Sequence, residues 1–206
     1  MLIRKNIKNI DVLLSFSSVY PEKLSRNEKR QAEQLSNLPR YRSWMYGRSA
    51  LKTLLLNLNL DLETSQLEFP NKRISLSHCS NVSVAAGFIT KDESIEGIGV
   101  DIELPRIVSD SHAKFYLSSK ERKITRNNDD RIRLWTVKEA LFKADQNNKN
   151  KVLSDFKIKN PKLHRGKAQN NAGNLFYYCS EQLSKSKIFK IKSEGWMSLA
   201  VSLKSS

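Results

Sequence analysis

Residues 97–106 read GIGVDIELPR, a short apolar run that ends in two carboxylates, Asp101 and Glu103. Successive side chains of a β-strand point to opposite faces, so a strand here would present both carboxylates on one face and Val100 and Ile102 on the other. Two like charges side by side repel each other, and burial strengthens the repulsion. The stretch therefore predicts a strand whose polar face meets a cation.

Length and composition predict a soluble globular protein, because 206 residues with 39% hydrophobic and 28% charged side chains can bury a core. No run approaches the ~20 apolar residues of a membrane span. The apolar stretch 9–20 is interrupted by Asp11 and followed by no small-residue cleavage site, which predicts a strand rather than a signal peptide. The two cysteines, Cys79 and Cys179, have no metal-ligand spacing and predict reduced thiols in a cytoplasmic protein.

The basic charge is concentrated in the second half of the chain. The net charge is +15; residues 1–104 carry 14 basic and 12 acidic side chains, whereas residues 105–206 carry 22 and 9. This asymmetry predicts a polyanionic partner, which could be phosphate groups, nucleic acid or an acidic protein. A basic surface with only a solubility role is the alternative.

The patterning of the chain predicts an α+β fold with helices and about three strands in each half. In the first half we expect a strand at 9–19, helices at 22–36 and 38–58, and strands at 73–78, 82–89 and 95–103. In the second half we expect helices at 111–126 and 130–145 and strands at 152–158, 174–183, 187–192 and 195–203. The similar content of the halves predicts two similar lobes, 1–104 and 105–206, each a small antiparallel sheet packed with helices.

A second polar pattern lies in the segment WTVKEALFK, residues 135–143. The side chains of Trp135, Glu139 and Lys143 are spaced i, i+4 and i+8 and share one face of a helix, with Lys138 beside them. Taken alone, a Glu–Lys pair at this spacing is ordinary for an exposed helix. The segment indicates a functional site only in combination with the strand carboxylates.

Three carboxylates can be combined into one set, Asp101 and Glu103 from the strand and Glu139 from the helix. Carboxylate oxygens are hard ligands that suit Mg²⁺. A Mg²⁺ ion that keeps several waters and binds substrate phosphates would neutralise the paired carboxylates of the strand. The set therefore predicts a magnesium site that acts on a phosphate-containing substrate.

The segment ISLSH adds His78 at a strand end, with the Ser77 hydroxyl directly before it. A single histidine is more often structural than functional, but this position would allow the pair to grip a phosphate. Lys72 and Arg73 lie just upstream and could add positive charge at the same place.

Three motifs occur in order along the chain: ISLSHC at 74–79, GIGVDIE at 97–103 and WTVKEALFK at 135–143. They resemble the motifs of the Sfp-type phosphopantetheinyl transferases, which are small-x-Ser-His, Gly-Ile/Val-Asp-x-Glu and Trp-Ser/Thr-x-Lys-Glu-Ala/Ser-x-x-Lys. The resemblance spans residues 40–145, and residues 146–206 match only in their strand-rich character. It implies two α+β lobes related by a pseudo-two-fold axis, with the active site in the cleft between them.

The resemblance implies an enzyme, a 4′-phosphopantetheinyl transferase of the holo-[acyl-carrier-protein] synthase type. Such an enzyme moves the 4′-phosphopantetheine of coenzyme A, its co-substrate, to a serine of an apo acyl, peptidyl or polyketide carrier protein. The other product is adenosine 3′,5′-bisphosphate. Phosphoryl-type transfer depends on positioning and charge neutralisation, so it needs no nucleophilic triad in the enzyme.

The resemblance also assigns roles to the residues of the carboxylate set. Asp101, Glu103 and Glu139 would hold Mg²⁺, or Mn²⁺ in its place. Glu139, or a water that it orients, would help to remove the proton of the attacking serine. Lys143 would stabilise charge on the phosphate or assist that proton transfer, and Trp135 would pack the helix.

Coenzyme A would be held mainly through its phosphates. Ser77 and His78 would bind the phosphates, and Lys138 would contact the pyrophosphate region. Four further basic side chains are candidates whose roles stay open: Arg42 and Arg48 for the 3′-phosphate, and Lys72 or Arg73 in place of the lysine in the family's Gly-Lys-Pro element.

The expected macromolecular partner is an acidic apo carrier protein, because a basic second half would speed and orient its approach. Phe115, Tyr116 and Leu117 could contact the carrier or could equally belong to the core. We expect a monomer, since the two lobes of one chain would each supply half of the site. We expect neither a membrane nor a nucleic acid as partner.

Two other functions remain as alternatives. A Mg²⁺-dependent nuclease also uses Asp, Glu and Lys for phosphodiester hydrolysis, but it gives no reason for the Ser-His and Trp-Thr-x-Lys-Glu patterns. A nucleic-acid-binding module would need exposed aromatic side chains between basic ones, as Tyr177 and Tyr178 near Lys185 and Lys187 suggest. Adjacent strand residues point to opposite faces, however, so only one of these tyrosines could lie on each face.

Overall fold

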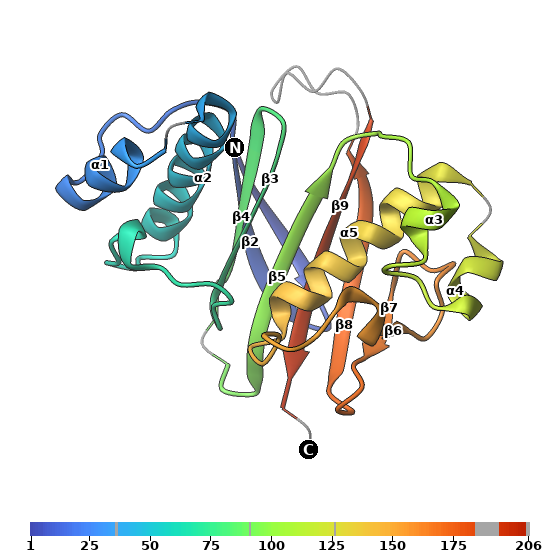
Figure 1. The fold of residues 1–206 in the computed structure, drawn as a ribbon. Helices are drawn as coiled ribbons and strands as arrows, with labels where there is room; N and C mark the ends of the chain where they lie inside the picture. Colours follow the sequence, from blue (N-terminus) through green and yellow to red (C-terminus); the bar gives the residue numbers. More distant parts are fainter. Residues whose placement is uncertain (36, 91, 126, 184–193, 205–206) are drawn as a thin grey trace.

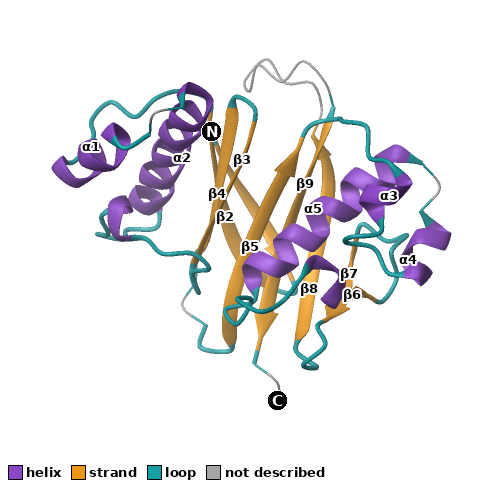
Figure 2. Ribbon diagram, in the orientation of Figure 1, coloured by secondary structure: helices purple, strands orange, loops and turns teal. Residues whose placement is uncertain are grey.

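In the computed structural model of the chain, two antiparallel sheets pack face to face and a long helix covers the outer face of each (Figures 1 and 2). The structure describes residues 1–35, 37–90, 92–125, 127–183 and 194–204. The strand order is β1-β2-β4-β3 in the first sheet and β5-β9-β8-β7-β6 in the second.

The elements follow one another from β1 to β9 along the chain. The strands of the first sheet are β1 (Leu2–Ile7), β2 (Ile10–Ser17), β3 (Ile74–Cys79) and β4 (Val82–Phe88). The strands of the second sheet are β5 (Ile95–Glu103), β6 (Lys157–Ile158), β7 (Arg165–Gln169), β8 (Leu175–Leu183) and β9 (Gly195–Leu203). The helices are α1 (Arg26–Glu33), α2 (Leu38–Asn57), α3 (Asp110–Ala113), α4 (Ser119–Ile124) and α5 (Asn128–Ala144), and 3-10 turns occupy Thr64–Gln66 and Leu153–Asp155.

Apolar side chains from both sheets meet in one core between them. Val12 and Val84 of the first sheet and Val100 and Leu199 of the second are all fully buried there. Separate apolar clusters fix α2 to the first sheet and α5 to the second. Strand alternation explains the layering, because strands such as β4 and β9 have one face for the shared core and one for the helix of their sheet.

Strand β5 shows this alternation at the place that matters for the site. Val100 and Ile102 point into the core between the sheets, whereas Gly97 and Gly99 lie against α5. A Cβ atom on Gly97 would collide with the carbonyl oxygen of Ala144, and one on Gly99 would collide with that of Ala140. The two glycines therefore let the α5 backbone lie directly on the strand, which brings the next outward residues of β5 close to the middle of α5.

We expect Gly99→Ala to lower both stability and activity, because the added methyl group must push α5 off the strand. Overpacking of this kind typically costs about 1–3 kcal/mol of unfolding free energy. Urea unfolding measures the loss. Glu96→Ala on the same strand is the matched control, and an unchanged midpoint for Gly99→Ala would contradict the close contact.

The expected α+β fold with antiparallel sheets is confirmed, but the expected division after Leu104 does not follow the sheets. That division assigns β5 to the first lobe, whereas β5 pairs with β9 of the second sheet along its length. Each outward β5 residue therefore belongs to the second sheet. The pseudo-two-fold relation between the lobes stays a prediction.

Local assignments differ from the expected ones in several places. The strand expected at 9–19 is one arm of a β1–β2 hairpin, closed by Lys8 and Asn9 with positive φ angles of 51° and 64°. The single helix expected at 111–126 is two short helices, each starting at a serine cap. The segment 152–158, expected as one strand, contains a 3-10 turn followed by the short strand β6. Strand β7 was not expected. The strand expected at 187–192 lies outside the described residues.

Candidate active site

The site forms where β3 and β5, the neighbouring edge strands of the two sheets, lie side by side and β5 packs on α5 (Figure 1). The backbone N–H of Val100 donates to the Ser75 hydroxyl at 3.0 Å, and the N–H of Leu104 donates to the Cys79 thiol at 3.4 Å. These bonds hold the two strands side by side in the same direction. Their carboxyl ends, which carry His78 and Glu103, therefore lie at the same end of the molecule.

Asp101 occupies the centre of the site and is 5% exposed. One carboxylate oxygen, Oδ1, accepts hydrogen bonds from the Ser77 hydroxyl and from the Lys143 ammonium, both at 2.8 Å. The other oxygen, Oδ2, is buried and has no hydrogen-bond partner among the described residues. Three sequence-predicted residues from three elements thus meet here, and one strong acceptor still lacks a donor.

Glu103 lies at the end of β5 in a partly buried position. The Arg106 guanidinium is 3.5 Å from its carboxylate, and the Cys79 thiol is 3.8 Å away. Burial raises the pKa of Glu103, the charge of Asp101 raises it further, and Arg106 opposes both effects. The cation expected beside the paired strand carboxylates is thus supplied in this structure by two side chains, Lys143 on Asp101 and Arg106 near Glu103.

Glu139 faces the same group of charges from α5. Burial raises its pKa, the Lys143 ammonium opposes this, and the charges of Asp101 and Glu103 raise it again. The three carboxylates therefore lie within electrostatic reach of one another. Their mutual repulsion is the property that a bound divalent cation would relieve.

His78 projects from the end of β3 beside this group and is exposed to solvent. The surrounding protein and the Lys143 ammonium lower the pKa of its imidazole, and the Asp101 charge acts in the opposite direction. The lowered pKa favours the neutral imidazole. A neutral imidazole can still donate one hydrogen bond to a phosphate oxygen.

The donor chemistry of the site fits a hard divalent cation. Asp101, Glu103 and Glu139 provide carboxylate oxygens, and the unpartnered Oδ2 of Asp101 is an acceptor that such an ion would satisfy. Across the described ranges, no three His, Cys, Asp or Glu side chains are already grouped as a metal site. The carboxylates are thus neighbours whose oxygens do not yet converge on one point.

A cavity of about 240 Å³ opens beside Lys143, between the end of α5 and the loop before β3. Its lining residues are Phe69, Pro70, Asn71, Ser75, Leu76, Phe142, Lys143 and Asn148. Lys143 belongs both to this cavity and to the Asp101 ion pair. Sequence reasoning missed Phe69, Phe142 and Asn148; the only available signals were the turn at Pro70 and the position of Phe142 directly before Lys143.

Comparison with known protein families finds one family model that matches this chain. Residues 97–200, from β5 to β9, match the family model of the 4′-phosphopantetheinyl transferase superfamily. The chain belongs to this superfamily. A search of curated proteins found no significant match. Within the part of the transferase that the structure describes, no helix has the length and apolar character needed to cross a membrane.

The two arginines of α2 in the transferase have different surroundings. The Arg48 guanidinium donates to the carbonyl oxygen of Thr64 and lies over the Trp44 ring, 4.8 Å from its centroid. Arg42 is exposed on the helix. Gly47 packs on Leu76 of β3, and Leu54 lies near Arg73 at the start of β3, so α2 runs opposite to β3. Arg42 therefore lies toward the end of β3 that carries His78.

Lys72 and Arg73 do not join His78 in the transferase. They precede β3, whereas His78 lies near its other end, so about 15–20 Å of extended strand separates them. Both line a different cavity of about 250 Å³ together with residues of β4 and the β4–β5 turn. The sequence-based expectation that they add charge at the Ser-His position is therefore not met.

Lys138 also differs from its expected position, because its side chain is completely buried on another face of α5. Its ammonium donates to the two Glu121 oxygens at 2.8 and 3.0 Å and to the carbonyl oxygen of Phe156. Burial lowers the pKa of Lys138 and Glu121 opposes this effect. All three ammonium hydrogens are thus used inside the protein, and we assign Lys138 a structural role in place of the expected pyrophosphate contact.

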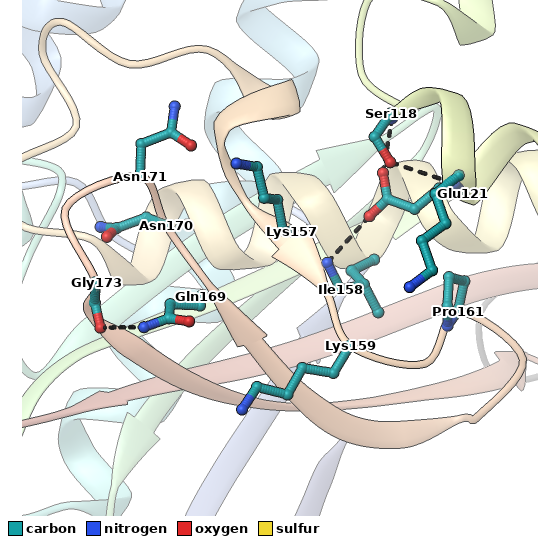
Figure 3. A pocket seen from close by; sticks show the side chains of 11 residues that line it. Ser118, Glu121, Lys157, Ile158, Lys159, Pro161, Gln169, Asn170, Asn171 and Gly173 are labelled. Carbon is teal, nitrogen blue, oxygen red and sulfur yellow. Dashed lines mark hydrogen bonds between the residues drawn. The ribbon is translucent and has the colours of Figure 1, made fainter.

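A larger cavity of the transferase lies elsewhere, between α4, β6 and β7 (Figure 3). It measures about 820 Å³, and Lys120, Lys157 and Lys159 are among its lining residues. None of the three carboxylates of the site contributes to it. The three carboxylates do not line the smaller cavity beside Lys143 either, so the buried charges at the β3–β5–α5 junction, and not cavity size, place the candidate site.

Proposed function

We propose that this protein transfers the 4′-phosphopantetheine group of coenzyme A to a serine of an apo carrier protein and releases adenosine 3′,5′-bisphosphate. Its superfamily acts on carrier proteins with coenzyme A as the donor. The observation that carries the proposal for this chain is the meeting of Ser77, Asp101 and Lys143 within 2.8 Å contacts, with Glu103 and Glu139 alongside. We further propose that it works as a cytoplasmic monomer, because one chain supplies every residue of the group.

The proposed reaction depends on Mg²⁺ held by Asp101, Glu103 and Glu139, and Mn²⁺ could serve in its place. When bound, the ion would neutralise charge on the coenzyme A pyrophosphate. The unpartnered Oδ2 of Asp101 and the mutual repulsion of the three carboxylates support this assignment.

The remaining steps fall to side chains of the chain itself. The serine oxygen of the carrier forms a bond to the phosphorus that bears pantetheine, and the bond from that phosphorus to the bridging oxygen breaks. Glu139, directly or through a water, accepts the proton that the serine loses. Lys143 lines the cavity and stabilises charge on the phosphate, and His78 donates to a phosphate oxygen. Ser77, expected to bind phosphate as well, donates its one hydroxyl proton to Asp101 and positions that carboxylate.

We propose that Arg42 rather than Arg48 holds the 3′-phosphate, because Arg48 is already engaged by Thr64 and Trp44. Arg42→Ala should raise the KM for coenzyme A by about tenfold or more, the usual effect of losing a charge-assisted hydrogen bond. Dephospho-coenzyme A, which lacks the 3′-phosphate, is the matched probe. The Arg42→Ala variant should have similar KM values for coenzyme A and dephospho-coenzyme A, whereas Arg48→Ala should keep the preference of the parent for coenzyme A. If Arg48→Ala instead loses the preference and Arg42→Ala keeps it, Arg48 holds the 3′-phosphate.

The activity itself is tested by intact-mass spectrometry of an apo acyl carrier protein incubated with this protein, coenzyme A and Mg²⁺. A mass gain of one phosphopantetheine group that EDTA abolishes is the expected result. Absence of a gain with several unrelated carriers, for a protein shown to be folded, would contradict the proposal. Hydrolysis of DNA under the same conditions would then favour the nuclease alternative.

A further inference from the structure

We propose that Arg106 is an internal cation that competes with the divalent metal ion for Glu103 and so sets the affinity of the site for that ion. In the protein without metal the Arg106 guanidinium lies beside the Glu103 carboxylate, and it moves aside when the ion binds there. The inference rests on the magnesium assignment of the proposed function. It names a residue whose removal should strengthen metal binding, whereas removal of a metal ligand weakens it.

The balance of charge in the site changes sign when a divalent ion is added. Asp101, Glu103 and Glu139 carry three negative charges when they are ionised. Lys143 and Arg106 bring two positive charges to Asp101 and Glu103. A divalent ion among these groups would leave an excess of one positive charge and would lie close to both side-chain cations. Because like charges repel, binding of the ion favours the departure of one of these two cations.

The contacts of the two cations indicate which one leaves. The Lys143 ammonium donates to Asp101 Oδ1 at 2.8 Å and to the carbonyl oxygen of Val100 at 3.2 Å, so the protein holds it at two points. The Nε atom of Arg106 is 3.5 Å from the Glu103 carboxylate, which is longer than the about 2.7–2.9 Å of a strong charge-assisted hydrogen bond. Arg106 is therefore the more weakly held cation and the one that the metal ion displaces.

Trp135 gives Arg106 a contact that does not depend on Glu103. The guanidinium lies over the indole ring, 5.0 Å from its centroid. The ring is itself held by the rings of Tyr116 at 5.0 Å and His112 at 5.6 Å. Because the face of an aromatic ring attracts a cation, Arg106 can give up the carboxylate and still be stabilised. Exchange with a metal ion is therefore easier than it would be for an isolated ion pair.

The backbone at Arg106 is fixed, so only its side chain has to move. The Asn128 side chain donates to the carbonyl oxygen of Arg106 at 2.7 Å and accepts from the N–H of Val108 at 2.7 Å. Pro105, directly before Arg106, restricts the backbone further. The Arg106 side chain, in contrast, is long and 33% exposed. The exchange is therefore a change of side-chain rotamer and needs no movement of the loop after β5.

The test measures Mn²⁺ binding to the metal-free full chain, without coenzyme A or carrier, through the electron paramagnetic resonance signal of the free ion. Arg106→Gln should bind Mn²⁺ about tenfold more tightly than the parent, because the competing charge is gone. Arg106→Lys keeps the charge and should stay within about threefold of the parent. Arg165→Gln removes an arginine of β7 that donates to the carbonyl oxygen of Asn6; it is the matched control and should stay within about twofold.

A double variant shows whether Arg106 acts through Glu103. Glu103→Gln removes a charged ligand and should weaken Mn²⁺ binding by about tenfold or more. In the Glu103→Gln background, Arg106→Gln should tighten binding by no more than about threefold, because no carboxylate is left for the two cations to share. Equal tightening in both backgrounds would show that Arg106 acts only through its charge at a distance, and this result would overturn the inference.

The outcomes separate this inference from the proposed function. If Glu103→Gln weakens Mn²⁺ binding but Arg106→Gln binds like the parent or more weakly, the competition is wrong and the metal assignment stands. If neither Glu103→Gln nor Asp101→Asn changes Mn²⁺ binding, or if the parent and every variant fail to bind the ion, the metal assignment and the inference are both wrong. The mass-spectrometric assay then decides separately whether the chain transfers phosphopantetheine.

Discussion

Replacing Glu139 by Gln is expected to abolish transfer while leaving the fold intact. The substitution keeps the shape of the side chain but removes a carboxylate that would both bind Mg²⁺ and accept the serine proton. Loss of either role lowers kcat/KM by about 10²–10⁴-fold, so we expect a drop of at least about 10³-fold in the mass-spectrometric assay. Glu93→Gln, which removes an exposed carboxylate from the β4–β5 turn, is the matched control.

The same variant has a readout that does not depend on turnover. The pKa of Glu139 is raised in the folded protein, so its protonated form stabilises the fold and its ionisation costs stability. The stability that the protonated group contributes is fully present below its unfolded pKa and is lost as the pH rises through the raised folded pKa. Without metal, Glu139→Gln should therefore unfold at higher urea than the parent at pH 7, and the difference should disappear toward pH 4.

Two results would contradict these assignments. Activity of Glu139→Gln within tenfold of the parent would exclude both roles of the carboxylate. A variant less stable than the metal-free parent at pH 7 would show that Glu139 is stabilised as an anion, which its burial beside Asp101 and Glu103 does not predict.

Replacing Lys138 by Met should lower the free energy of unfolding more than Gly99→Ala does. Glu121 is 2% exposed, and removal of the ammonium would leave its charge buried without a cation. Breaking a buried ion pair in this way costs about 3–5 kcal/mol of unfolding free energy, which urea unfolding measures. The folded fraction of the Lys138→Met variant should have the same KM for coenzyme A as the parent.

A second substitution provides the control for Lys138. Glu121 also accepts hydrogen bonds from the backbone N–H groups of Ser118 at 2.7 Å and Ile158 at 3.0 Å, which a Gln at this position could retain in part. Lys138→Met with Glu121→Gln should therefore recover much of the lost stability. Unchanged stability of Lys138→Met together with a raised KM for coenzyme A would instead support the sequence-based pyrophosphate role.

Sequence reasoning was most successful where the relevant geometry is local. Alternation along 97–103 predicted that Asp101 and Val100 would face opposite directions, and helical spacing predicted that Glu139 and Lys143 would share a face. The structure has both arrangements, with Lys143 bonded to Asp101. These relations follow from the backbone period alone, so they need no knowledge of the rest of the fold.

The sequence was least informative where the outcome depends on a partner distant in sequence. Which sheet β5 joins is decided by β9, nearly 100 residues later, and no local pattern of β5 distinguishes β9 from β4. Lys138 precedes Glu139 by one residue and so points about 100° away around the helix, toward Glu121 instead of the site. Spacing could place it on another face, but only packing could show that this face is buried.

The sequence by itself determined the order of the three motifs, the faces on which their side chains lie and the basic character of the second half. Backbone geometry and composition dictate these properties, and both depend only on residues that are close in sequence or on residue counts. Only the tertiary structure decided that Gly97 and Gly99 bring α5 onto β5, that Lys143 and Arg106 supply the cations for Asp101 and Glu103, and that Arg48 and Lys138 are engaged elsewhere. The reason is physical: the free energy of a buried charge depends on which groups surround it in space, and long-range packing chooses those groups.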